Sequence, residues 1–178
     1  TANKAMLAEH GAEIFAQARR FGRSVAFEAS VAGGIPIVHS LAVGLAANEI
    51  QSLAAIVNGT CNFILSSMGV SGVTYEAALA EAQYLGYAEA DPTLGVGGHA
   101  AANKLVVLAM LAFGARVAHE SVHTEGIEHI ESSDHDFVAR FGYAIKHLAI
   151  GRDRGDSVEL RVHPALVPRD TAIANVNG

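Results

Sequence analysis

The chain contains 178 residues, of which 51% are hydrophobic, and this is enough for one domain with a sizeable buried core. Its 12 basic and 18 acidic residues give a net charge of −6 without a basic cluster, which excludes a surface built to wrap nucleic acid or to lie on an anionic membrane. The longest apolar run, residues 105–113, is too short to span a membrane, so a small molecule or another protein is the expected partner.

Hydrophobic periodicity and capping residues predict a series of helices and strands. In chain order, we expect a helix over residues 3–20, a strand over 24–29, a helix over 36–45, a strand over 49–57, helices over 61–68, 75–85, 98–113 and 132–141, and a hairpin of strands over 143–151 and 157–163. Gly22, Pro36 and Thr74 support these boundaries, because they are typical of a helix end, a first helical position and an N-cap. The helix near residue 98 is apolar nearly all round after Lys104, which favours burial. The sequence therefore predicts an α+β domain in which helices cover one side of a mixed sheet.

Two short motifs match known signatures by their letters but lack the context that the chemistry needs. Residues 95–100, Gly-Val-Gly-Gly-His-Ala, fit the pattern of a dinucleotide-binding loop, yet no strand is expected before them, so a flexible substrate loop is the preferred interpretation. Residues 119–123, His-Glu-Ser-Val-His, spell a zinc-protease signature, but they follow an expected helix stop and no zinc site is predicted. The single cysteine, Cys61, permits no internal disulfide, which favours a reducing, cytoplasmic location.

A family resemblance rests on three longer motifs, which are residues 27–36 (Phe-Glu-Ala-Ser-Val-Ala-Gly-Gly-Ile-Pro), 58–62 (Asn-Gly-Thr-Cys-Asn) and 86–93 (Gly-Tyr-Ala-Glu-Ala-Asp-Pro-Thr), the last followed by Lys104. Together they resemble the substrate-binding domain of homoserine dehydrogenase. The resemblance implies an NAD(P)-dependent enzyme that interconverts L-homoserine and L-aspartate 4-semialdehyde in threonine and methionine biosynthesis. It also implies a homodimer, with residues 1–22 as a remnant helix of a nucleotide-binding domain and residues 23–178 as the substrate-binding and dimerisation domain.

Two lysines are the expected catalytic residues. Lys104 lies near the start of an apolar helix, where the helix dipole and desolvation both disfavour its charged form. A lysine in isolation would more often lay its stem over apolar surface and reach water. The family resemblance favours the other role, in which Lys104 gives the proton to the substrate oxygen. The same resemblance implies that Lys4 assists catalysis and contacts the cofactor.

The resemblance also assigns binding roles to residues 58–60 and 86–89. Glu89 is expected to hold the amino group of the substrate and to lie near the cofactor, although a solvated loop acid is the alternative. Gly86 is expected where the backbone meets the nicotinamide end of the cofactor, while a helix C-cap explains this glycine equally well. Asn58, Gly59 and Thr60 match the turn beside the substrate, but a strand-to-helix turn favours the same residue types.

A monovalent cation site is the last feature that the resemblance implies. The matching residues are Glu28, Val31, Gly33 and Ile35, mostly through backbone carbonyls, and coordination by oxygen alone suits a hard cation such as sodium. A purely structural Gly-Gly-Ile-Pro turn without an ion is nearly as good an interpretation.

Two positions depart from the family pattern. The family places aspartates where this chain has Gly95 and Ala100. Because residues four apart share a helix face, a carboxylate at position 100 would stand beside Lys104 and favour its protonated form. We therefore expect impaired turnover of homoserine. The alternatives are a non-catalytic homologue that binds an amino acid or serves as a dimerisation module, and an oxidoreductase that acts on a different aldehyde.

Overall fold

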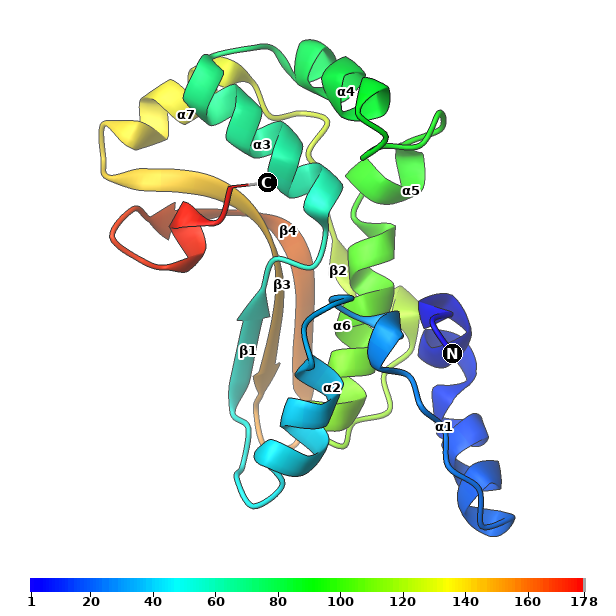
Figure 1. The fold of residues 1–178 in the computed structure, drawn as a ribbon. Helices are drawn as coiled ribbons and strands as arrows, with labels where there is room; N and C mark the ends of the chain where they lie inside the picture. The colour runs from blue at the N-terminus through cyan, green and yellow to red at the C-terminus, as the bar shows by residue number, and fades with distance from the viewer. Residues whose placement is uncertain (178) are drawn as a thin grey trace. The chain divides into compact units, whose positions relative to one another are not determined.

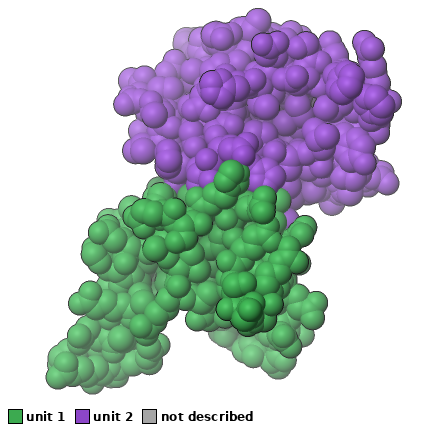
Figure 2. Space-filling view, turned by 180° about the vertical axis from the view of Figure 1, so that it is seen from behind, with its two compact units in different colours: residues 1–53, 102–123, 150–161 green, residues 54–101, 124–149, 162–178 purple. Residues whose placement is uncertain are grey.

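The structure is a computed structural model that describes residues 1–177, and it divides into two compact units (Figure 2). Unit 1 consists of residues 1–53, 102–123 and 150–161, and unit 2 consists of residues 54–101, 124–149 and 162 onwards. Three separate stretches of chain build each unit. Neither unit could therefore be recognised as one continuous block of sequence.

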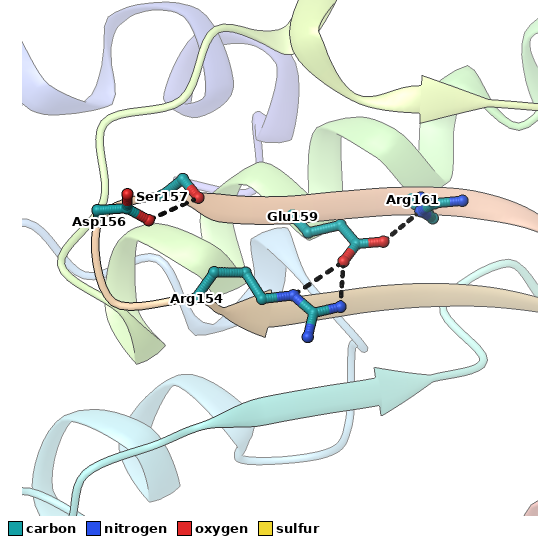
Figure 3. A network of polar contacts seen from close by, with 5 residues as sticks. All are labelled: Arg154, Asp156, Ser157, Glu159 and Arg161. Atoms are coloured by element: carbon teal, nitrogen blue, oxygen red, sulfur yellow. Dashed lines mark hydrogen bonds and ion pairs between the residues drawn. The ribbon is translucent and has the colours of Figure 1, made fainter.

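Within the described residues, a four-stranded sheet has the order β1 (Ser52–Ala55), β3 (Tyr143–Asp153), β4 (Val158–Pro168) and β2 (His123–Thr124) (Figure 1). The β3–β4 hairpin closes through the amide of Arg154, which donates to the carbonyl of Ser157 at 2.9 Å. Glu159 on β4 then binds two arginines, because Arg154 in the turn donates to its carboxylate at 2.6 Å and Arg161 on β4 approaches the other carboxylate oxygen at 2.5 Å (Figure 3). The expected hairpin is confirmed, and both of its strands run longer than the periodicity indicated.

The helices are α1 (Lys4–Arg20), α2 (Ile37–His39), α3 (Gly59–Ser71), α4 (Tyr75–Tyr84), α5 (Thr93–Val96), α6 (His99–Ala112) and α7 (Ser132–Ala139), with a π-helical turn over Ser40–Gly44 and 3₁₀ turns over Glu28–Ser30, His119–Ser121 and Ile173–Asn175. Side chains set several of their boundaries. The hydroxyl of Thr74 accepts from the amide of Ala77 at 3.3 Å and starts α4. Gly72 ends α3 with a φ of 66°, a left-handed conformation that glycine adopts without strain. The expected α+β class is confirmed.

The core of unit 2 forms around α3, which packs against α4, α5 and α7 (Figure 1). Its fully or almost fully buried members on α3 are Cys61, Ile64, Leu65 and Met68. The facing residues come from α4, α5, α7, β3 and the loop before α7, and they are Ala78, Ala82, Val96, Ile127, Val138 and Ile145. Small alanines on α4 let that helix approach α3 closely. Because α3 also contacts α5 and α7, it is the central element of this unit.

The core of unit 1 forms around α6, whose residues 105–109 are buried without interruption. Helix α1 approaches α6 at Gly11, where an added Cβ would lie 3.0 Å from the Met110 side chain. Strand β3 approaches the end of α6 at Gly151, where a Cβ would lie 2.9 Å from Phe113. Glycine at these two positions therefore leaves room for the side chains of Met110 and Phe113. No helix in the described residues is long and apolar enough to cross a membrane.

The strand that we expected over residues 24–29 is wrong. Residues 24–27 have no regular structure, and a 3₁₀ turn over Glu28–Ser30 follows them. Both the amide and the hydroxyl of Ser30 donate to the carbonyl of Phe27, at 2.9 and 2.6 Å. These local hydrogen bonds compete with strand pairing, and the apolar pattern alone did not reveal them.

Two substitutions on α3 test its central role. Ile64→Ala removes a side chain with 0% exposure from the unit 2 core, and we expect it to lower the free energy of unfolding by about 2 to 5 kcal/mol. Val70→Ala, at 78% exposure on the same helix, should change it by less than about 0.5 kcal/mol. Urea unfolding measures both, and equal effects of the two substitutions would contradict this description of the core.

Candidate functional site

The residues that the sequence assigns to a site belong to both units. In unit 1 these residues are Lys4, Glu28, Val31, Gly33, Ile35 and Lys104, and in unit 2 they are Asn58, Gly59, Thr60, Gly86 and Glu89. Unit 2 brings its five residues into one neighbourhood at the start of α3 and the end of α4. Each group is described within its own unit below.

Asn58 connects α3 to α5. Its side-chain oxygen accepts from the amide of Cys61 at 3.1 Å and caps α3, while its side-chain nitrogen donates to the carbonyl of Gly95 at 2.7 Å. The side chain is only 7% exposed. Both ends of the amide are thus engaged with backbone, and Asn58 serves to position the neighbouring segments.

Thr60 holds the loop that follows α4. Its hydroxyl donates to the carbonyl of Tyr87 at 2.6 Å, and the Tyr87 ring lies edge-on to Phe63 with 5.1 Å between ring centroids. Gly86, with a φ of 77°, turns the chain out of α4 into this loop, so its C-cap role is real. Around these contacts lies a largely apolar cavity of about 470 Å³, lined by Gly59, Thr60, Phe63 and Tyr87.

Glu89 lies on the same loop, and its side chain is exposed. The backbone at this point is fixed, since the side-chain amide of Gln83 donates to the carbonyls of Glu89 and Ala90 at 3.1 and 3.3 Å. An exposed carboxylate on a fixed backbone is suited to bind a cationic group. Sequence reasoning predicted Glu89 but missed the aromatic rings of Phe63 and Tyr87, because apolar spacing does not distinguish a cavity wall from core.

Asp91 organises the end of this loop. One of its carboxylate oxygens accepts from the hydroxyl of Thr93 at 2.6 Å and from the amide of Thr93 at 3.2 Å. These hydrogen bonds, the hydroxyl first, lower the pKa of Asp91 below its ordinary value. The spacing Asp-x-Thr is typical of such a turn, and it could have revealed the role of Asp91 from the sequence.

The glycine-rich stretch at residues 95–100 comprises the end of α5, a turn at residues 97–98 and the start of α6. No strand precedes it, as expected, but helical turns occupy most of the stretch in place of the expected flexible loop. Gly98 has a φ of 86°, and an added Cβ would lie 3.0 Å from the Thr124 side chain and 3.1 Å from the carbonyl of Glu125. Close packing against the chain near residue 124 therefore explains this glycine. The zinc-protease letters at residues 119–123 likewise form a 3₁₀ turn followed by β2, and not the α-helix that the zinc site requires.

The two positions that depart from the family pattern lie around the start of α6. An added Cβ at Gly95 would meet no atom within 4 Å, whereas one at Gly97 would lie 2.7 Å from the carbonyl of Thr93. Ala100 is half-buried in the first turn of α6. Position 95 therefore has room for a side chain, and packing does not explain why glycine stands there.

In unit 1, Lys4 is the first residue of α1 and Lys104 lies in the second turn of α6, and both are half-buried. The side chain of Asn3 caps α1 by accepting from the amide of Met6 at 3.0 Å. Lys104 immediately precedes the buried run of α6.

Glu28 has a structural function that the sequence did not reveal. Its two carboxylate oxygens accept from the amides of Val38 and His39 at 2.8 and 2.9 Å and so bind the N-terminal end of α2. In the turn that follows, the carbonyl of Ile35 accepts from the amide of Ile37 at 2.8 Å. Within residues 1–177, neither the carbonyl of Val31 nor that of Gly33 accepts a hydrogen bond.

Comparison with known proteins places these features in a family. The model of the homoserine dehydrogenase family matches residues 36–178. The homoserine dehydrogenase of Pseudomonas aeruginosa is 55% identical over 178 residues, which are 100% of this chain and 41% of that protein. The chain thus spans about two fifths of the length of such relatives.

Solved structures agree with the sequence comparison. A homoserine dehydrogenase from Thiobacillus denitrificans matches with a TM-score of 0.97 and 50% identity, over 100% of this chain and 41% of that chain. A hyperthermophilic archaeal homoserine dehydrogenase in complex with NADPH matches with a TM-score of 0.84 and 26% identity, over 100% of this chain and 50% of that chain.

Removing the Thr60 hydroxyl tests whether it fixes the cavity loop. We expect Thr60→Val to cost about 1 kcal/mol of stability and to speed amide hydrogen exchange at residues 86–90, because the carbonyl of Tyr87 loses its donor. Thr171→Val is the matched control, since it removes a similar hydrogen bond of 2.7 Å to Pro168. Unchanged exchange in residues 86–90 of Thr60→Val would show that other contacts hold the loop.

A titration tests the Asp91 turn. Thr93→Val deletes the hydroxyl that contributes most to the lowered pKa of Asp91, so this pKa should rise toward its ordinary value in a ¹³C carboxyl NMR titration. Because the pKa is lowered in the folded chain, the carboxylate holds the turn at neutral pH and releases it as the pH falls through the lowered pKa. The control substitution Thr60→Val should leave the titration of Asp91 unchanged. If the pKa of Asp91 stays the same in Thr93→Val, the contact with Thr93 is ruled out.

Proposed function

We propose, since this chain belongs to the homoserine dehydrogenase family, that it supplies the substrate-binding part of an NAD(P)-dependent homoserine dehydrogenase. The observation that carries the proposal is the cavity at the start of α3, with the Gly86–Glu89 segment fastened to it by Thr60 and Gln83. An exposed carboxylate beside an apolar cavity fits a small substrate that has both an ammonium group and a short aliphatic chain.

The proposed reaction interconverts L-homoserine and L-aspartate 4-semialdehyde. The NAD(P) cofactor, when bound, supplies or accepts the hydride. Gly86 fits contact with the nicotinamide end, because its φ of 77° turns the backbone and an added Cβ would meet no atom within 4 Å. The choice between NAD and NADP depends on residues of a nucleotide-binding domain.

The chain's own residues would bind, orient and protonate. Glu89 would hold the ammonium group of the amino acid, and Gly59 and Thr60 would form the cavity wall beside its carbon chain. In aldehyde reduction, the Lys104 ammonium would donate its proton to the carbonyl oxygen as the hydride reaches the carbonyl carbon. In the reverse direction, neutral Lys104 would take the hydroxyl proton. Lys4 would assist in positioning the cofactor or in relaying the proton.

The turn after Glu28 is proposed to hold a monovalent cation such as sodium. The carbonyls of Val31 and Gly33 have unused lone pairs, and a carbonyl that already accepts one hydrogen bond, as at Ile35, keeps a second. Neutral oxygens together with one carboxylate suit a hard ion of low charge. Glu28 would have to coordinate the ion while it binds the amides of α2.

We also propose that the protein acts as a homodimer in the cytoplasm.

Restoring the two acidic positions tests the proposed function in a protein that also carries a nucleotide-binding domain. Gly95→Asp and Ala100→Asp together should raise kcat/KM for homoserine at least tenfold, since a charge-assisted hydrogen bond contributes about 1.5 to 3 kcal/mol. Position 95 has the room for this side chain. The exposed Ala80 provides the control, and Ala80→Asp, with the same added charge, should change nothing. Lys104→Met should then remove the regained turnover.

The same preparations separate the rival function. A protein that binds homoserine in calorimetry, shows no affinity for NADP and gains no turnover from the restored aspartates would be a non-catalytic homologue. Turnover of another aldehyde, with none of aspartate 4-semialdehyde, would instead identify an oxidoreductase of different specificity.

A further inference from the structure

A second cavity in unit 2 lies between α3, β3 and the last described residues of the chain, and its volume is about 340 Å³. Its polar lining residues are Ser66, His135, Lys146, Arg169, Asn175 and Asn177. Among the described residues, no aspartate or glutamate lines it. Lys146 and Arg169 thus share a cavity with no carboxylate among its described lining residues, and none of the residues assigned above to a site contributes to it.

Lys146 is the buried cation of this cavity. Although it lies on β3, where alternation would expose one face, residues 145–149 are all buried and Lys146 is only 3% exposed. Its ammonium donates to the carbonyl of Val176 at 2.6 Å and to the side-chain oxygen of Asn177 at 3.1 Å, with longer contacts to Ser66 and Asn62. All four acceptors are neutral. Burial lowers the pKa of Lys146 through desolvation, and among residues 1–177 no carboxylate pairs with its charge.

His135 also lines this cavity. It is 6% exposed, and its Nε2 is buried and has no hydrogen-bond partner among residues 1–177. Its ring lies against α3 at Gly69, where an added Cβ would come within 2.8 Å of Nδ1. Burial is the main reason that its pKa is lowered, and the charges of Lys146 and Arg169 lower it further, against the opposite effect of Asp134 and Asp136. The basic groups are therefore close enough to interact.

Arg169 offers donors on this cavity. Its Nε donates to the carbonyl of Tyr143 at 3.1 Å, which fixes the guanidinium. In the described part of the chain its terminal nitrogens make no hydrogen bond or ion pair, and the residue is exposed. A fixed guanidinium with two such nitrogens is the group that binds planar or tetrahedral oxyanions in a bidentate manner.

We propose that this cavity is a binding site for a small oxyanion of the carboxylate or phosphate class, held by Lys146 and Arg169. The ligand would supply the negative charge that the described lining residues lack and would give the terminal nitrogens of Arg169 a partner. A role of Lys146 as a mere anchor for Val176 and Asn177 accounts for the ammonium contacts but leaves the position of Arg169 unexplained.

The test is an NMR titration of the full chain in a phosphate-free buffer, with inorganic phosphate and with acetate as separate probes. We expect saturable shifts confined to amides around residues 66, 135, 146 and 169. The stronger probe identifies the oxyanion class. Sodium chloride at equal ionic strength should give no saturable shift at these amides.

Substitutions at two exposed arginines make the test specific. Arg169→Gln should weaken binding of the stronger probe at least tenfold, whereas Arg140→Gln, which removes an exposed arginine just after α7 that does not line the cavity, should leave it unchanged. Lys146→Met should abolish binding if it folds, and Arg169→Gln decides the matter if it does not. The proposal would be overturned if neither probe gave saturable shifts, or if the two arginine variants lost affinity for the probe equally.

Discussion

The bifunctional contact of Asn58 is the constraint on which the candidate site depends. One amide side chain caps the first turn of α3 and holds the carbonyl of Gly95, so the start of one helix and the short helix α5 are fixed to each other. The loop between α4 and α5 has little freedom, because Thr60, Gln83 and Asp91 bind its backbone or close its last turn. A site that needs a carboxylate at a fixed place on a loop gains this precision from buried polar contacts outside the loop.

Most of the longer helices could be predicted from the sequence because single capping or turn residues mark their boundaries. Thr74 before α4 is such a residue, and the turn residues 153–157 between β3 and β4 likewise marked the hairpin. Residues 24–29 show the limit of that reading. Their short apolar run is typical of a buried strand, but a strand requires a partner, and the hydroxyl of Ser30 closes a local turn instead.

The candidate site was predicted as a set of residues, whereas their tasks came from the structure. Glu28 and Asn58 were assigned by resemblance to ligand binding, yet the structure shows each of them binding backbone amides at a helix N-terminus. Lys146 could not have been found by periodicity, since five consecutive residues of β3 are buried and both faces of the strand are covered there. Burial on both faces is a property of the packed neighbours, and no local pattern records it.

Helix α3 contributes to two cavities at once, with Gly59, Thr60 and Phe63 in its first half and Ser66 and Gly69 in its second. Its 13 residues make a rod of about 20 Å, held along its middle by Ile64, Leu65 and Met68. Because buried side chains hold its centre, a tilt of this rod would turn about that centre. A tilt that widened the cavity at one end would then change the width of the cavity at the other, so the stiffness of a single helix would link the two volumes.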